Sequence, residues 1–160
     1  MKKIVITSLL MIFAIFVSFG QAKTKTFSFN GISFEHDKGC KIYNFGGSLS
    51  AYFKGNTIVI MKLADDSPVE YFEMYLKGLY ETQEAKLGST YSYISEITSR
   101  TINGIETKSF DVKYSSGKYE RHLVFIEKGS LFQIIIKSSS GKTIDSDFAT
   151  ILNSFHFESM

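Results

Sequence analysis

Two segments of this chain are apolar at nearly every position, and they constrain the fold more than any other feature of the sequence. The first covers residues 57–63 and contains Ile58, Val59, Ile60, Met61 and Leu63. The second covers residues 131–136 and contains Leu131, Phe132, Ile134, Ile135 and Ile136. Neighbouring side chains of a strand point to opposite faces, so each segment would present apolar groups on both faces. Strands of this kind are covered on both sides. We therefore expect both segments in the interior of a layered fold.

Two stretches of helical periodicity are available as covering layers. Ser67 suits an N-cap, Pro68 suits the first helical position, and Glu70 completes a capping box. Apolar residues then recur at helical spacing, which predicts a helix over 68–86. A similar pattern predicts a second helix over 143–154. The chain thus has one amphipathic helix for each face of a sheet.

Short turns indicate that the strands are antiparallel. Asn30-Gly31, Asn103-Gly104 and Lys128-Gly129 are two-residue hairpin signals, because Asn and Gly tolerate positive φ. The predicted strands cover residues 49–53, 57–63, 91–102, 105–114, 119–126 and 131–137. Residues 35–48 read as irregular. The expected fold class is α+β, an antiparallel β-sheet with a helix on each face, which is an α/β/α sandwich.

The order of these segments resembles that of the PsbP-like family, named after an extrinsic photosystem II subunit and including small exported bacterial proteins. The resemblance is carried by three stretches, Phe29 to Phe34, Ile102 to Ile105 and Phe148 to Phe155. It implies an α/β/α sandwich and a non-enzymatic accessory or binding role.

Residues 1–22 read as a cleavable secretory signal peptide. Lys2 and Lys3 precede an apolar run of sixteen residues, which is shorter than the roughly 20 residues of a membrane span. Small residues close the run, which predicts cleavage between Ala22 and Lys23. We expect an exported protein, periplasmic or secreted, with no stable membrane span after cleavage. A retained N-terminal anchor is the alternative.

Residues 23–160 are enough for a single domain. Lys2 and Lys3 leave with the signal, so the mature chain has 16 basic and 16 acidic residues. This balance gives no electrostatic case for nucleic acid. Cys40 is the single cysteine, so an internal disulfide is impossible and the core alone must hold the fold. We expect no cofactor.

Four tyrosines are candidates for binding an unknown protein or small ligand. Tyr71 and Tyr75 lie one helical turn apart in the predicted helix, and Tyr91 and Tyr93 share a face of a predicted strand. An exposed patch of tyrosines is typical of surfaces that bind a partner. In the alternative interpretation, the rings belong to the core and only their hydroxyl groups reach solvent.

Two further chemistries remain as alternatives to a non-catalytic binding domain. Glu35, His36 and Asp37 bring potential metal ligands together in sequence, but a metal site would need a bend in the strand. Cys40 with His36 or His122 is a conceivable thiol or hydrolytic pair. We expect a protein that is not an enzyme.

Overall fold

The computed structural model describes residues 24–67, 69–139 and 144–158. The N-terminal part of the fold contains β1 (Thr24–Phe29), β2 (Ile32–Asp37), β3 (Lys41–Asn44), β4 (Ser48–Phe53), β5 (Asn56–Ala64) and α2 (Val69–Glu84). The C-terminal part contains β6 (Tyr91–Ile94), β7 (Thr98–Ile102), β8 (Ile105–Tyr114), β9 (Tyr119–Glu127), β10 (Ser130–Ser138), α3 (Ile144–Asp147), α4 (Ala149–Ser154) and β11 (His156–Phe157). The predicted signal peptide and its cleavage site at Ala22 and Lys23 lie outside the described residues.

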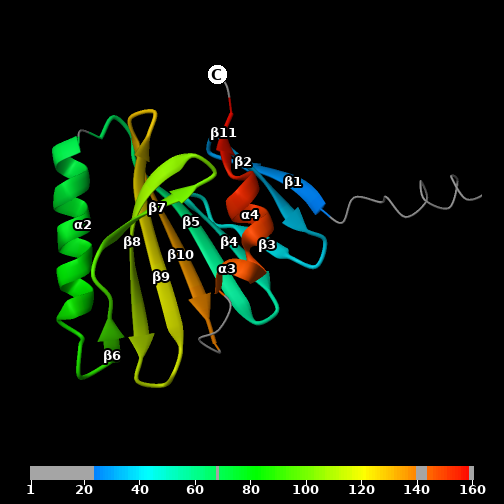
Figure 1. Cartoon of the computed structure of the whole chain (residues 1–160). Helices are drawn as coiled ribbons and strands as arrows, with labels where there is room; N and C mark the ends of the chain where they lie inside the picture. Colours follow the sequence, from blue (N-terminus) through cyan, green and yellow to red (C-terminus); the bar gives the residue numbers. More distant parts are fainter. Residues whose placement is uncertain (1–23, 68, 140–143, 159–160) are drawn as a thin grey trace, which may run out of the picture.

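An antiparallel sheet forms the centre of the molecule (Figure 1). Among the described residues it has eight strands in the order β3-β4-β5-β10-β9-β8-β6, and β7 pairs with β8 beside this path. The two apolar segments are the strands β5 and β10, which are neighbours in the interior of the sheet. Ile58, Ile60, Ile134 and Ile136 are completely buried. The predicted interior position of both segments is confirmed.

One face of the sheet is covered by α2. Its buried side packs on an apolar cluster that lies mainly on β8, β9 and β10, and this cluster includes Leu76, Tyr91, Phe110, Val112, Val124 and Leu131. Figure 1 shows α2 as a separate layer that runs along these strands. The helix predicted over 68–86 is confirmed as an element. However, Ser67 Oγ is buried and has no hydrogen-bond partner among the described residues, so the expected capping box is not formed.

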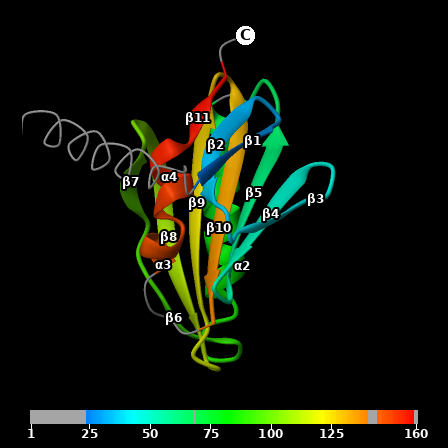
Figure 2. The same cartoon turned by 90° about the vertical axis from the view of Figure 1, so that its right-hand side faces the viewer.

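The other face is covered by a mixed layer. A small sheet in the order β1-β2-β11 packs with α4 over the large sheet, and Figure 2 shows this layer in front of β9 and β10. Phe34, Phe148 and Phe155 are buried in the shared core. The antiparallel, layered α+β fold agrees with expectation, but the second cover consists of strands and short helical turns together.

The hairpin turns follow the sequence closely. Asn30 and Gly31 have φ values of 50° and 77°, and Asn103 and Gly104 have φ values of 44° and 85°. Both residues of each pair are left-handed, as a type I′ turn requires. These turns fix the pairing of β1 with β2 and of β7 with β8.

Three sequence interpretations were wrong in detail. The predicted strand 91–102 is broken into β6 and β7, because the hydroxyl of Ser95 accepts the backbone N–H of Asp111 and replaces a ladder bond. Residues 35–48, read as irregular, contain the end of β2 and the whole of β3. The predicted helix 143–154 is interrupted at Phe148, whose side chain is buried.

Candidate functional site

The position of α2 leaves part of its sheet face uncovered. On one side, Tyr80 packs edge-on against Phe110 of β8 with ring centroids 5.3 Å apart. On the other side, the hydroxyl of Tyr75 donates to Oε1 of Gln133 on β10 across 2.9 Å. The strand that α2 approaches most closely is β9. Ala64 at the end of β5 still joins the cluster under α2, but in the described part of the chain no other helix or strand lies over β5, β4 and β3 on this face.

Strand register identifies the side chains of this uncovered area. One row of paired residues crosses the sheet from β8, which lies under α2, to the edge strand β3. In this order, its members are Phe110, His122, Ile135, Val59, Ser50 and Tyr43. Cross-strand partners project from the same face of a sheet. Thus Ile135, Val59 and Tyr43 lie on the face that carries α2, but beyond its edge. Ile135 and Val59 are only partly buried, in contrast to Ile134 and Ile60 on the opposite face.

Neighbouring rows add a sulfur side chain and two more aromatic rings. Met61 pairs with Gln133, and Tyr52 pairs with Thr57. Tyr43 contacts Tyr52 edge-on at 5.5 Å and Phe45 in a stacked arrangement at 6.3 Å. The exposed fractions of the three rings are 47% for Tyr43, 44% for Tyr52 and 65% for Phe45. We define the open half-face as Tyr43, Phe45, Tyr52, Val59, Met61 and Ile135.

A shallow groove of about 450 Å³ runs along the flank of α2. It is lined by Tyr71, Met74, Tyr75, Gly78, Leu79 and Thr82. At 100° per residue, one side of α2 carries a stripe formed by Tyr71, Tyr75, Gly78 and Thr82. Because Tyr75 bonds to Gln133 of β10, this stripe faces β10 and the open half-face. Gly78 is in the middle of the stripe, and a Cβ atom added there would meet no heavy atom within 4 Å. The helix therefore has a notch at Gly78.

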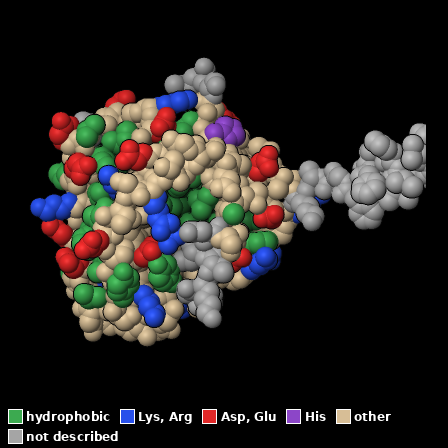
Figure 3. Space-filling model, in the orientation of Figure 1, with side chains coloured by type: hydrophobic (Ala, Val, Ile, Leu, Met, Phe, Trp, Pro, Cys, Tyr) green, Lys and Arg blue, Asp and Glu red, His purple; other side chains and the backbone are tan. Residues whose placement is uncertain are grey.

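The outer surface of α2 is acidic. Four exposed glutamates accompany a single lysine, Lys77, and they are Glu70, Glu73, Glu81 and Glu84. Lys77 Nζ lies 3.8 Å from a carboxylate oxygen of Glu81. Figure 3 shows acidic side chains gathered along the α2 edge of the molecule. The open half-face is thus bordered by acidic side chains on its α2 side, whereas Lys41 lies beside Tyr43 and Tyr52 at its β3 side.

The structure does not bring the four candidate tyrosines into one site. Tyr71 and Tyr75 line the groove next to the open half-face. Tyr91 is 4% exposed, donates to Gln83 Oε1 across 2.7 Å and packs edge-on against Tyr114. Tyr93 is exposed, but it lies on β6 at the opposite end of the sheet from β3. Sequence reasoning missed Tyr43, because β3 was read as irregular. Tyr52 lies in the predicted strand 49–53, but only the pairing of β4 with β3 brings it beside Tyr43.

A row of buried polar groups lies under and beside α2. Gln133, which accepts from Tyr75, donates to Nδ1 of His122 across 3.2 Å. Nε2 of His122 lies 3.6 Å from Oε2 of Glu120. Lys137 Nζ is 2.7 Å from the other carboxylate oxygen of Glu120. Burial alone would raise the pKa of Glu120, but His122 and Lys137 outweigh burial and lower this pKa to about 2.

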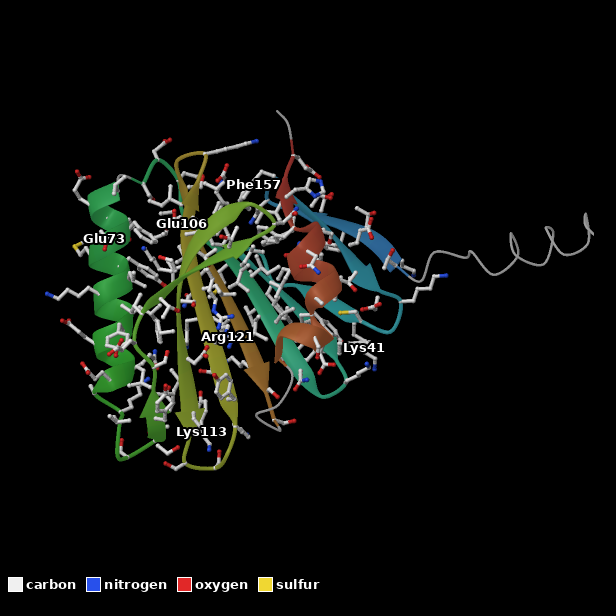
Figure 4. The ribbon with its side chains drawn as sticks, in the orientation of Figure 1. Lys41, Glu73, Glu106, Lys113, Arg121 and Phe157 are labelled. Carbon is white, nitrogen blue, oxygen red and sulfur yellow. The ribbon has the colours of Figure 1, made fainter. Side chains whose placement is uncertain are left out.

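A second hollow, of about 400 Å³, lies between the sheet and α4 on the face away from α2. Ile102 and Leu123 line it from the sheet, and Leu152 lines it from α4. Arg121 also lines it, and Figure 4 shows this residue beside β9 on the side away from α2. Its Nε lies 2.7 Å from Oδ1 of Asp111. Burial would raise the pKa of Asp111, but Arg121 and Tyr119 lower it.

The three candidate metal ligands, Glu35, His36 and Asp37, form hydrogen bonds with different partners. Nδ1 of His36 lies 3.0 Å from the backbone oxygen of Asp37, and the His36 side chain is 7% exposed. The Glu35 carboxylate accepts from Thr24, and the Asp37 carboxylate accepts from Thr150 of α4. No group of three potential metal ligands occurs in residues 24–67, 69–139 and 144–158. The side chains of Glu35, His36 and Asp37 are thus engaged in the packing of β2.

Cys40 lies in a tight turn between β2 and β3. Its N–H donates to the backbone oxygen of Asp37 across 2.9 Å, and its side chain is partly buried. Burial and the neighbouring Asp37 carboxylate raise the pKa of the thiol from 9.0 to about 11. The nucleophilic thiolate is therefore scarce near neutral pH.

No family model matches the sequence, and no curated protein matches it. Solved structures do match the fold. The solution structure of cyanobacterial PsbP (CyanoP) from Synechocystis sp. PCC 6803 matches with a TM-score of 0.60, 14% sequence identity and coverage of 86% of this chain and 94% of that one. The chain has a PsbP-like fold.

A crystal structure from Bacteroides thetaiotaomicron VPI-5482 also has a similar fold, with a TM-score of 0.59 and 10% identity. The match covers 86% of this PsbP-like chain and 49% of the Bacteroides chain. At these identities the likeness shows the fold alone. Among the described residues of this PsbP-like domain, no helix is both long enough and apolar enough to cross a membrane.

Proposed function

We propose that this chain is an exported, non-catalytic accessory domain of the cell envelope that binds a protein partner through the open half-face. The observation that carries the proposal is the partial cover of the sheet by α2. Val59, Met61 and Ile135 are only partly buried at places where a covered sheet would bury them completely, and three exposed aromatic rings extend the same surface. Contiguous apolar and aromatic surface of this kind is typical of protein-binding sites.

Three further observations support this proposal. The first 22 residues have the three-part pattern of a secretory signal. The PsbP-like fold agrees with the accessory role that the family resemblance implies. The groups with catalytic potential are engaged otherwise, since Cys40 has a raised pKa and the Glu120 and Asp111 carboxylates form ion pairs.

A photo-crosslinking amino acid placed on the surface tests the partner-binding role. It replaces Tyr52 or Tyr71 at the proposed surface, and Leu87 or Ile97 at exposed positions elsewhere. We expect one discrete adduct, identified by mass spectrometry, from the first two positions and not from the other two. Equal adducts at all four positions, or none at Tyr52 and Tyr71, would contradict partner binding at the open half-face.

A further inference from the structure

The space beside α2 has the dimensions of a second helix. Strands in a sheet are about 4.8 Å apart, so β5 lies about 10 Å from β9, with β10 between them. Packed helices have axes 8–10 Å apart. Because α2 lies closest to β9, a helix packed against α2 has its axis over β5. Val59 and Met61 are the partly buried side chains at that place.

The flank of α2 is shaped for close approach by such a helix. The stripe from Tyr71 to Thr82 is about 16 Å long, which corresponds to a partner segment of about 12 residues. Gly78 leaves a notch in the middle of this stripe. Glycine in a helix interior costs about 1 kcal/mol relative to alanine, and no packing contact within the described residues requires glycine at this position. The notch lets a partner side chain approach the backbone of α2.

Charge determines the type of helix that fits. Helical geometry places Glu81 on the flank next to the stripe, and Glu70 lies on the same side of α2. A partner helix beside α2 places its own polar flank against these carboxylates. Lysine or arginine on that flank would be attracted, and acidic residues would be repelled. A second copy of this chain would bring two acidic α2 ridges together, which disfavours self-association through this face.

From this geometry we infer that the open half-face takes an amphipathic helix of a partner protein, whose apolar stripe packs on Val59, Met61 and Ile135 and whose basic flank faces the glutamates of α2. This inference rests on the proposed function, because it specifies the partner of the same surface. It adds the secondary structure, the length and the charge of the partner segment.

Two synthetic peptides of 14 residues test the inference against the full chain. Both carry the same leucines at helical spacing; one has lysines on the flanks and the other has glutamates. Fluorescence anisotropy measures the Kd, and NMR signals of Val59, Met61 and Ile135 report the location. We expect the basic peptide to bind at least 10-fold more tightly at low salt, to perturb these signals, and to lose affinity as salt increases.

Two substitutions separate docking from stability. A Cβ atom at position 78 meets no heavy atom within 4 Å, and leucine favours a helix more than glycine does. Gly78→Leu should therefore fill the notch and weaken binding of the basic peptide at least 10-fold without lowering the melting temperature. Glu81→Lys should weaken binding about 3- to 10-fold. Glu73→Lys is the matched control, because it makes the same charge change on the opposite flank of α2, and it should change the Kd less than 2-fold.

The outcomes distinguish the inference from the proposed function. If the acidic peptide binds the open half-face as tightly as the basic peptide, the inferred partner charge is wrong but the docking surface stands. If neither peptide perturbs Val59, Met61 or Ile135, both the inference and the surface are wrong. A dimer of the chain that dissociates on Gly78→Leu substitution would replace the inferred helix with a second copy.

Discussion

The hydroxyl of Tyr75 on α2 donates to Oε1 of Gln133 on β10 across 2.9 Å, and this bond connects the helix to the sheet at the border of the open half-face. Gln133 is 3% exposed and also contacts His122. The folded protein loses stability when a hydrogen-bond partner of a buried amide is removed, because the amide is left unsatisfied. The bond therefore contributes to holding α2 over β9 rather than over β5.

Removal of this hydroxyl should lower stability measurably. Tyr75→Phe should reduce the free energy of unfolding by about 1–2 kcal/mol, because Gln133 Oε1 loses its donor in a buried place. Urea denaturation measures the change. Tyr71→Phe is the matched control on the same helix, and its effect should stay below about 0.5 kcal/mol because this side chain is exposed. Equal losses in the two variants would show that the Tyr75 bond does not anchor α2.

The two faces of β10 should respond differently to the same truncation. Ile134 is completely buried and Ile135 is only partly buried, although they are adjacent. Ile134→Ala should cost about 3–4 kcal/mol, as expected for a core isoleucine. Ile135→Ala should cost less than half of that. If calorimetry gives the same loss for both, the half-face is not open in solution.

Acid should destabilise the protein through Glu120. Its pKa is about 2 in the folded protein and 4.5 in the reference state, so the unfolded chain binds the proton more readily. Stability from this group is complete above pH 4.5 and is lost as the pH falls from 4.5 toward 2. The loss should be on the order of 1 kcal/mol after screening by solvent.

Unfolding free energies measured between pH 7 and pH 2 check this sign. Glu120→Gln should flatten the acid limb of the profile. Asp111, whose pKa is also lowered, keeps its own contribution in that variant. A wild-type profile that is flat down to pH 2 would be inconsistent with the pairing of Glu120 with Lys137.

Cys40 should react slowly in the folded protein. A pKa of about 11 instead of 9.0 reduces the thiolate fraction about 100-fold near neutral pH. Iodoacetamide at pH 8, followed by mass spectrometry, should alkylate the native chain about 100-fold more slowly than the same chain in urea. Equal rates in the two conditions would restore Cys40 as a candidate reactive thiol.

The proposed export predicts where the N-terminus of the mature protein lies. Expression of the full coding sequence in a bacterial host should yield a protein outside the cytoplasm that begins at Lys23, because the predicted signal peptide ends at Ala22. N-terminal sequencing of the fractionated protein measures this. A protein that keeps its first residues in the membrane fraction would favour the retained anchor.

The sequence predicted the layers better than the surface. Residues 58–63 and 131–136 are rich in branched apolar side chains, which place β5 and β10 inside the sheet. Yet Val59 and Ile135 are as apolar as Ile60 and Ile134, so hydrophobicity alone cannot show that the first pair is only partly buried. That difference depends on where α2 lies, and long-range contacts such as the one between Tyr75 and Gln133 determine its position.

The tyrosines illustrate the same limit. Helical spacing placed Tyr71 and Tyr75 on one flank of α2, which is a local property. The burial of Tyr91 depends on contacts with Gln83 and Tyr114, which lie elsewhere in the sequence. The break at Ser95 likewise depends on a side-chain bond to Asp111. Local periodicity contains no information about such contacts.

The small sheet has a consequence for when the molecule can fold. β2 near the start of the fold pairs with β11, and Ile32 is opposite Phe157, 125 residues later. The second cover of the large sheet is therefore incomplete until that last strand has left the ribosome. Pairings across such sequence separations also form slowly. Both effects delay completion of the fold during synthesis, and such a delay is consistent with the proposed export, because a chain has to be unfolded to pass through a narrow secretion channel.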